Sequence, residues 1–132
     1  MKVLLADDSG LILERLQEML GILDQVEITG SFKNGTDTLA AIRTMKPDLV
    51  ILDIKMPGLS GLEVLAEVRK EDQIIKFIIL TFNSTDDYKQ LAIQLGADYF
   101  FNKANEFDKV SLVVAGLAEK AKNENMAKKW QN

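Results

Sequence analysis

Five short apolar segments alternate with five longer amphipathic segments along the chain. The apolar segments are mostly Val, Ile, Leu and Phe, which is typical of strands buried on both faces of a parallel sheet. The segments between them carry apolar residues three or four positions apart, which predicts helices. This alternation predicts an α/β fold, a doubly wound parallel sheet with helices on both faces. The strands are expected at 2–7, 26–32, 48–53, 75–81 and 98–102.

Turn and capping residues predict where the helices end. The second helix should stop before Pro47, and the fourth should close at Gly96. The fifth should begin near Glu106 and run toward the C terminus. We expect one domain over 1–121, followed at 122–132 by a polar C-terminal tail or an extension of the last helix.

Acidic residues end two of the predicted strands. Asp7 and Asp8 close the first strand, and Asp53 closes the third. Open α/β sheets bind ligands at the carboxyl ends of their strands, and carboxylates that converge there repel one another unless a cation joins them. A hard divalent cation with oxygen ligands, Mg²⁺ above all, is therefore the expected cofactor. For Asp7 and Asp8 the alternative is that they cap the next helix.

A hydroxyl and an ammonium group close the other two strands of interest. Thr81 ends the fourth strand and Lys103 follows the fifth. Taken singly, each is better explained as an ordinary strand or surface residue. Together with the three carboxylates they suit a phosphoryl group bound with Mg²⁺. One carboxylate would act as nucleophile, and the hydroxyl and ammonium would contact phosphate oxygens.

The composition excludes several classes of function. The chain has no Cys and no His, so thiolate chemistry, disulfides, histidine ligation and a phosphohistidine of its own are excluded. A net charge of −4 without a basic patch argues against nucleic-acid binding by this domain alone. No apolar stretch approaches the roughly 18 residues of a membrane span, and the start is too acidic for a signal peptide. We expect a cytoplasmic protein without membrane association.

The ordered set of strand-end residues resembles the receiver domain of two-component response regulators. It comprises DD after the first strand, D-x-x-M-P-G after the third, T at the fourth and K at the fifth, and the resemblance covers about residues 2–120. The resemblance implies a flavodoxin-like strand order, 2-1-3-4-5. It also implies a phosphoacceptor module that is not an enzyme beyond its own phosphorylation and slow dephosphorylation. Its partners would be a histidine kinase or phosphotransfer protein and a downstream target, with homodimerisation as an option.

The resemblance assigns a role to each site residue. Asp53 is the phospho-acceptor, and Thr81 and Lys103 bind the phosphoryl oxygens. Thr81 and Phe100 form the switch that follows phosphorylation. The implied Mg²⁺ ligands are Asp7, Asp8, Asp53 and the backbone carbonyl of Lys55. The implied output surface lies on the fourth helix, fifth strand and fifth helix, with Tyr88, Leu91, Tyr99 and Lys109.

Two residues depart from the family's usual pattern. Ala104 follows Lys103, where the family usually has a proline after a cis bond. A cis bond before a non-proline residue costs about 3–4 kcal/mol, so this loop is either strained or trans, and the resting position of Lys103 is open. Phe82 follows Thr81, where many receivers carry a small residue, and its ring would narrow access to the site.

The sequence is less consistent with several other classes of protein. Several segments are most similar in sequence to receivers that precede a LuxR-type helix-turn-helix. We nevertheless expect a stand-alone receiver rather than a fragment of such a DNA-binding regulator. A metal-dependent phosphohydrolase with an aspartate nucleophile typically carries D-x-D, whereas Asp53 is followed by Ile54-Lys55. A nucleotide or flavin binder would need a glycine-rich phosphate loop, which the sequence lacks. A receiver that has lost phosphorylation would not retain all five site residues.

Overall fold

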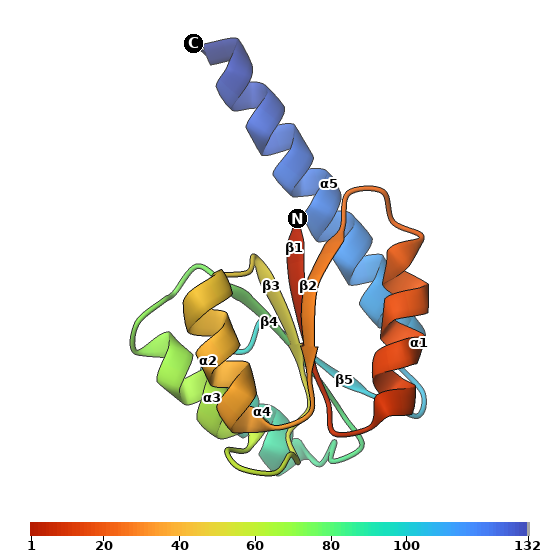
Figure 1. The fold of residues 1–132 in the computed structure, drawn as a ribbon, viewed down its shortest axis with the longest axis vertical. Helices are drawn as coiled ribbons and strands as arrows, with labels where there is room; N and C mark the ends of the chain where they lie inside the picture. Colours follow the sequence, from red (N-terminus) through yellow and green to blue (C-terminus); the bar gives the residue numbers. More distant parts are fainter. Residues whose placement is uncertain (132) are drawn as a thin grey trace.

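The computed structural model describes residues 1–131 and contains one five-stranded parallel sheet in the order β2-β1-β3-β4-β5 (Figure 1). The elements in chain order are β1 (Lys2–Ala6), α1 (Gly10–Gly21), β2 (Glu27–Phe32), α2 (Gly35–Met45), β3 (Leu49–Leu52), α3 (Gly61–Arg69), β4 (Lys76–Thr81), α4 (Asp86–Gln94), β5 (Tyr99–Asn102) and α5 (Phe107–Gln131). All four strand pairings are parallel. The predicted fold class and strand order are confirmed, and each predicted strand agrees with the observed one to within one residue at either end.

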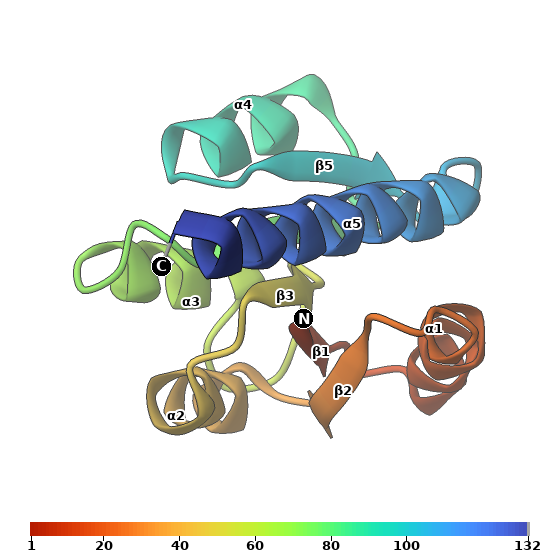
Figure 2. The ribbon, with the colours of Figure 1, turned by 90° about the horizontal axis from the view of Figure 1, so that it is seen from above.

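Two apolar layers hold the helices against the sheet. Successive residues of a strand point to opposite faces, so Leu4 packs on one side and its neighbours Val3 and Leu5 on the other. The first side is covered by α2, α3 and α4, and the second by α1 and α5. Figures 1 and 2 show α2 and α3 on one side of the strands and α1 on the other. β3 is buried on both faces and is apolar throughout, while β1 and β4 each begin with one exposed lysine before their buried residues.

Local signals end the helices where the sequence predicts. α2 ends at Met45, and Lys46 adopts a left-handed conformation (φ 47°) directly before Pro47. Gly96 follows the C-cap of α4 with a φ of +106°, a conformation that glycine adopts without strain. Ser60 and Glu63 form a reciprocal capping box at the start of α3. The cap of α3 closes the loop that follows β3 at the carboxyl edge of the sheet, whereas the ends of α2 and α4 lead into β3 and β5 at the amino edge.

The last helix, α5, extends beyond the sheet (Figure 1). α5 runs for 25 residues, and its C-terminal part projects beyond the sheet (Figure 1). The polar segment that begins at residue 122 therefore continues the helix as far as Gln131, while the final residue, Asn132, lies outside the described residues. Trp130 is 86% exposed. Within the described part of the chain, no helix combines the length and the apolar character that a membrane crossing requires.

Candidate functional site

The carboxyl ends of β1 and β3 bring three carboxylates together. These strands are neighbours, with Ala6 opposite Leu52, and the Asp53 N–H donates to the Ala6 carbonyl (3.0 Å). One oxygen each from Asp7, Asp8 and Asp53 lies within 4.8 Å of the others. Asp7 and Asp53 are buried, whereas Asp8 is exposed. The cluster that the sequence predicts is therefore present, with one open side at Asp8.

Neither Asp7 nor Asp8 is the N-cap residue of α1. Ser9 is the N-cap, and its hydroxyl accepts a hydrogen bond from the Ile12 N–H (3.3 Å). Asp7 Oδ1 accepts from the Ser9 N–H (2.9 Å), which orients this carboxylate before the helix begins. The helix-capping interpretation of Asp7 and Asp8 is thus wrong, because Ser9 is the N-cap residue of α1.

Lys103 brings a positive charge into the cluster. Its Nζ lies 2.5 Å from Asp7 Oδ2 and 2.8 Å from Asp53 Oδ2, and its side chain is only 3% exposed. No peptide bond among residues 1–131 is cis, so the bond to Ala104 is trans. The loop without its proline still delivers the ammonium group to Asp53. The Lys103 N–H also donates to the Thr81 carbonyl (3.0 Å), which ties the start of this loop to β4.

Burial and charge act against each other within the cluster. Burial raises the pKa of Asp7, and the neighbouring Asp53 adds to this rise, while hydrogen bonds from Lys103 and Ser9 oppose it. Burial alone would lower the pKa of Lys103, but the hydrogen bonds and charges of Asp53 and Asp7 outweigh it, so the net direction is upward. Lys103 is therefore protonated at neutral pH. One ammonium cannot neutralise three carboxylates, and the remaining all-oxygen donor set with an exposed Asp8 fits a hard divalent cation.

Thr81 ends β4 and Phe100 lies on β5, so neither belongs to the acidic cluster. Thr81 is fully buried, and its hydroxyl accepts from the Asn83 N–H (3.1 Å). Among the described residues, no hydrogen bond joins Thr81 to the three carboxylates. Phe100 is 9% exposed and packs with the layer beneath α3 and α4. The structure therefore places Thr81 at the carboxyl end of the strand next to β3, and Phe100 on β5 opposite Ile79.

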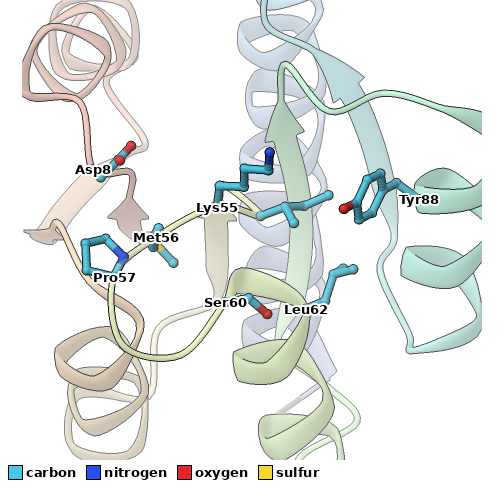
Figure 3. A pocket seen from close by; sticks show the side chains of 8 residues that line it. Asp8, Lys55, Met56, Pro57, Ser60, Leu62 and Tyr88 are labelled. Carbon is cyan, nitrogen blue, oxygen red and sulfur yellow. The ribbon is translucent and has the colours of Figure 1, made fainter.

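Two clefts meet at the acidic cluster. Figure 3 shows the first, of about 470 Å³, with Lys55 between Asp8 on one side and Tyr88 on the other. The second, of about 480 Å³, is lined by Asp8, Asp53, Lys55, Phe82 and Lys103 among others. The ring of Phe82 is 63% exposed, and its centroid lies 5.2 Å from Lys103 Nζ. The exposed ring therefore lines the second cleft beside the buried lysine, and Asp8 and Asp53 line the same cleft.

Sequence reasoning missed one residue at the site. Asn102 precedes Lys103, and its side chain accepts from the backbone N–H groups of Ala104 and Asn105. The signal in the sequence is an asparagine at the end of a predicted strand, where Asn side chains commonly bind backbone N–H groups two or three residues later.

The position of Asp53 depends on a close approach by Gly61. The Gly61 N–H donates to the Ile54 carbonyl (2.7 Å), and a Cβ on Gly61 would lie 1.8 Å from the Asp53 carbonyl oxygen. We predict that Gly61→Ala lowers the free energy of unfolding by about 2 kcal/mol, because the loop after β3 must shift to admit the methyl group. Urea unfolding measures this change.

A matched substitution should have the opposite sign. Gly116 lies inside α5 with nothing within 4 Å of its would-be Cβ. Gly116→Ala should raise the free energy of unfolding by up to about 1 kcal/mol, because alanine is the better helix residue. If Gly61→Ala is as stable as the parent, the close approach does not constrain the loop that carries Asp53.

Comparison with known proteins agrees with the geometry. The response regulator receiver domain profile matches residues 3–115. The response regulator GacA of Pseudomonas syringae is 32% identical over 118 residues, which cover 89% of this chain and 50% of GacA. A protein-glutamate methylesterase/protein-glutamine glutaminase of Carboxydothermus hydrogenoformans is 37% identical over 130 residues, which cover 97% of this chain and 37% of that protein. The chain thus spans half the length or less of these two relatives.

A solved structure shows the same likeness. A DNA-binding response regulator of the LuxR family from Staphylococcus aureus superposes with a TM-score of 0.81 at 30% identity, over 89% of this chain and 98% of that one. The fold, the acidic cluster at the ends of β1 and β3, and the sequence match agree. The chain therefore belongs to the response regulator receiver domain family.

Proposed function

We propose that this receiver accepts a phosphoryl group on Asp53 from a histidine kinase or a phosphotransfer protein in the cytoplasm. The observation that carries the proposal is the Lys103 ammonium bridging Asp7 and Asp53 beside the exposed Asp8. Asp53 Oδ1 accepts from the Ile54 N–H (2.7 Å), and Oδ2 accepts from Lys103 (2.8 Å). Both contacts hold the carboxylate at the edge of the open cleft.

The transfer needs positioning more than acid–base catalysis. A carboxylate oxygen of Asp53 forms the new O–P bond while the N–P bond of the phosphohistidine breaks, and the leaving imidazole takes a proton. Asp7, Asp8, Asp53 and the Lys55 carbonyl would hold Mg²⁺. The ion, when bound, would neutralise charge on the carboxylate and the incoming phosphate. Lys103 would remain beside the reacting oxygen and contact a phosphoryl oxygen.

The product would change the charge beside β4 and β5. A phosphoryl group adds roughly −1.5 to −2 of charge. Thr81 is buried at the end of β4, and its hydroxyl proton would turn to donate to that group. Phe100 would then repack into the space that Thr81 leaves. Converting such a switch from mostly off to mostly on takes about 5.5 kcal/mol of differential stabilisation.

The changed surface would be read by a downstream protein. Tyr88 and Leu91 lie on α4, Tyr99 on β5 and Lys109 on α5. Leu91 is 42% exposed. Lys109 pairs with Glu106 (2.9 Å) next to the loop that carries Lys103. α4 follows the loop after Thr81, and the loop that carries Lys103 joins β5 to α5, so a shift of either loop would move part of this surface. We propose no turnover beyond self-phosphorylation and slow dephosphorylation.

Acetyl phosphate tests the proposal without a cognate kinase. With Mg²⁺ present, intact mass spectrometry should show a gain of one phosphoryl group, and EDTA should prevent it. Borohydride reduction of the acyl phosphate should then convert only Asp53 to homoserine in the peptide map. The proposal is wrong if no phosphoryl group is gained at saturating Mg²⁺. Sustained hydrolysis of an unrelated phosphomonoester would instead favour a phosphohydrolase.

A further inference from the structure

The side chain of Asn102 holds the loop that carries Lys103. Asn102 Oδ1 accepts hydrogen bonds from the Ala104 N–H (2.7 Å) and from the Asn105 N–H (3.3 Å). The asparagine side chain thereby closes a turn around Lys103, the residue between its two ends. Lys103 is the buried member of this turn, whereas Ala104 and Asn105 are exposed. The turn fixes the backbone from which the lysine side chain reaches the acidic cluster.

The same asparagine joins this loop to the one that follows β4. Its Nδ2 donates to the Ser84 hydroxyl, and the Ser84 N–H donates to the Phe82 carbonyl (3.1 Å). Its backbone N–H donates to Glu106 Oε1 (3.1 Å) at the start of α5. The loop of Thr81 and the loop of Lys103 are thus held together at their rims by one amide group.

The shorter hydrogen bond to Asn102 requires a residue other than proline at position 104. A proline at position 104 has no N–H and would leave Asn102 Oδ1 without its shorter hydrogen bond. Alanine supplies that N–H on a trans peptide bond. Ordering a loop residue costs about 1–2 kcal/mol of backbone entropy, so a loop without a rigid ring needs another restraint. The two hydrogen bonds to Asn102 Oδ1 provide one.

We propose that Asn102 is a positioning residue for Lys103: it takes the place of a proline in presenting the ammonium to Asp53, and through Ser84 it couples this presentation to the Thr81 loop. The proposal rests on the proposed function of Lys103 in phosphoryl transfer. Asn102 does not touch the reacting atoms. Its effect on phosphorylation therefore passes through Lys103 and should vanish when that lysine is absent.

Phosphorylation by acetyl phosphate with Mg²⁺ gives the first test. Asn102→Ala should lower the initial rate about tenfold, the effect of losing interactions that together contribute about 1.4 kcal/mol. Asn102→Asp retains the acceptor oxygen and should recover most of the rate, whereas Asn105→Ala, a matched change at an exposed neighbour, should leave it unchanged. In a Lys103→Met background, Asn102→Ala should cause no further loss. An equal loss in both backgrounds would overturn the proposal.

Lysine labelling gives a second test that does not require phosphorylation. Reductive methylation read by peptide mass spectrometry should be slow at Lys103 and fast at Lys109, whose side chains are 3% and 57% exposed. Asn102→Ala should raise the Lys103 rate several-fold relative to Lys109, and Asn102→Asp should restore it, at temperatures where both variants are folded. Ser84→Ala isolates the bridge and should give a smaller rise. Unchanged Lys103 labelling in Asn102→Ala refutes the positioning role, even if the parent protein accepts no phosphoryl group.

Discussion

The Asp53→Asn variant is expected to gain no phosphoryl group from acetyl phosphate under conditions in which the parent protein is fully modified. The amide is not a nucleophile, and the proposed acceptor is the carboxylate that the Ile54 N–H and Lys103 hold at the cleft. Intact mass with Mg²⁺ measures the result directly.

The loss should not come from unfolding. Asp53→Asn removes one negative charge from a group of three carboxylates, and Lys103 keeps its contact with Asp7 (2.5 Å). Since repulsion with Asp7 is relieved, the free energy of unfolding should be equal to or higher than that of the parent. Urea unfolding in EDTA checks this.

A matched carboxylate change separates the acceptor from a metal ligand. Asp8→Asn removes the exposed member of the cluster and leaves Asp53 intact. This variant should still be phosphorylated, but at higher Mg²⁺ concentrations than the parent requires. If Asp53→Asn is modified while Asp8→Asn is not, the acceptor has been assigned to the wrong strand end.

Lys103→Met is expected to lower the free energy of unfolding by about 3 kcal/mol or more in EDTA, and to slow phosphorylation severely. The side chains of Lys103, Asp7 and Asp53 are 3%, 2% and 7% exposed, so the substitution leaves two buried carboxylates without their shared cation. Removing one partner of a buried ion pair is costly, because the remaining charge stays desolvated. Methionine is chosen because it preserves most of the apolar stem.

Mg²⁺ should restore more stability to Lys103→Met than to the parent. Without the ammonium the oxygen cluster is more negative, so a cation binds it more tightly and stabilises the folded state further. The restored variant should still be slow to accept phosphate, because the ammonium contact to the phosphoryl oxygen remains missing. Urea unfolding with and without Mg²⁺, together with intact mass, separates these two effects.

An exposed lysine in the next turn supplies the control. Lys109 pairs with Glu106 on the surface and is 57% exposed. Lys109→Met should change the free energy of unfolding by less than about 0.5 kcal/mol, because exposed ion pairs contribute little. If Lys103→Met and Lys109→Met behave alike in EDTA, the buried bridge does not stabilise the fold.

The strands and the acidic cluster followed from patterns that are local in the chain. Val3 to Ala6 and Leu49 to Leu52 are apolar at every position, and only strands buried on both faces accommodate that. An aspartate after each such strand then lies at the carboxyl edge. The neighbouring placement of β1 and β3 came with the family resemblance, since no local pattern specifies which strands pair.

Other features became visible only in three dimensions. The contact from Lys103 to Asp53 joins residues 50 positions apart, and the sequence left open whether the loop after Lys103 is strained or trans. The bridge from Asn102 to Ser84 joins two loops that follow different strands. The structure likewise decided between a polar tail and an extension of the last helix, since α5 continues to Gln131.

The sequence by itself determined which residues end the strands, and hence that three carboxylates, a hydroxyl and an ammonium gather at one edge of the sheet. The strand ends are predictable because burial and strand periodicity leave a pattern in each local segment. Only the tertiary structure decided that Lys103 lies between Asp7 and Asp53 and that Asn102 holds its loop. These arrangements depend on distances between segments far apart in the chain, which packing of the whole domain sets.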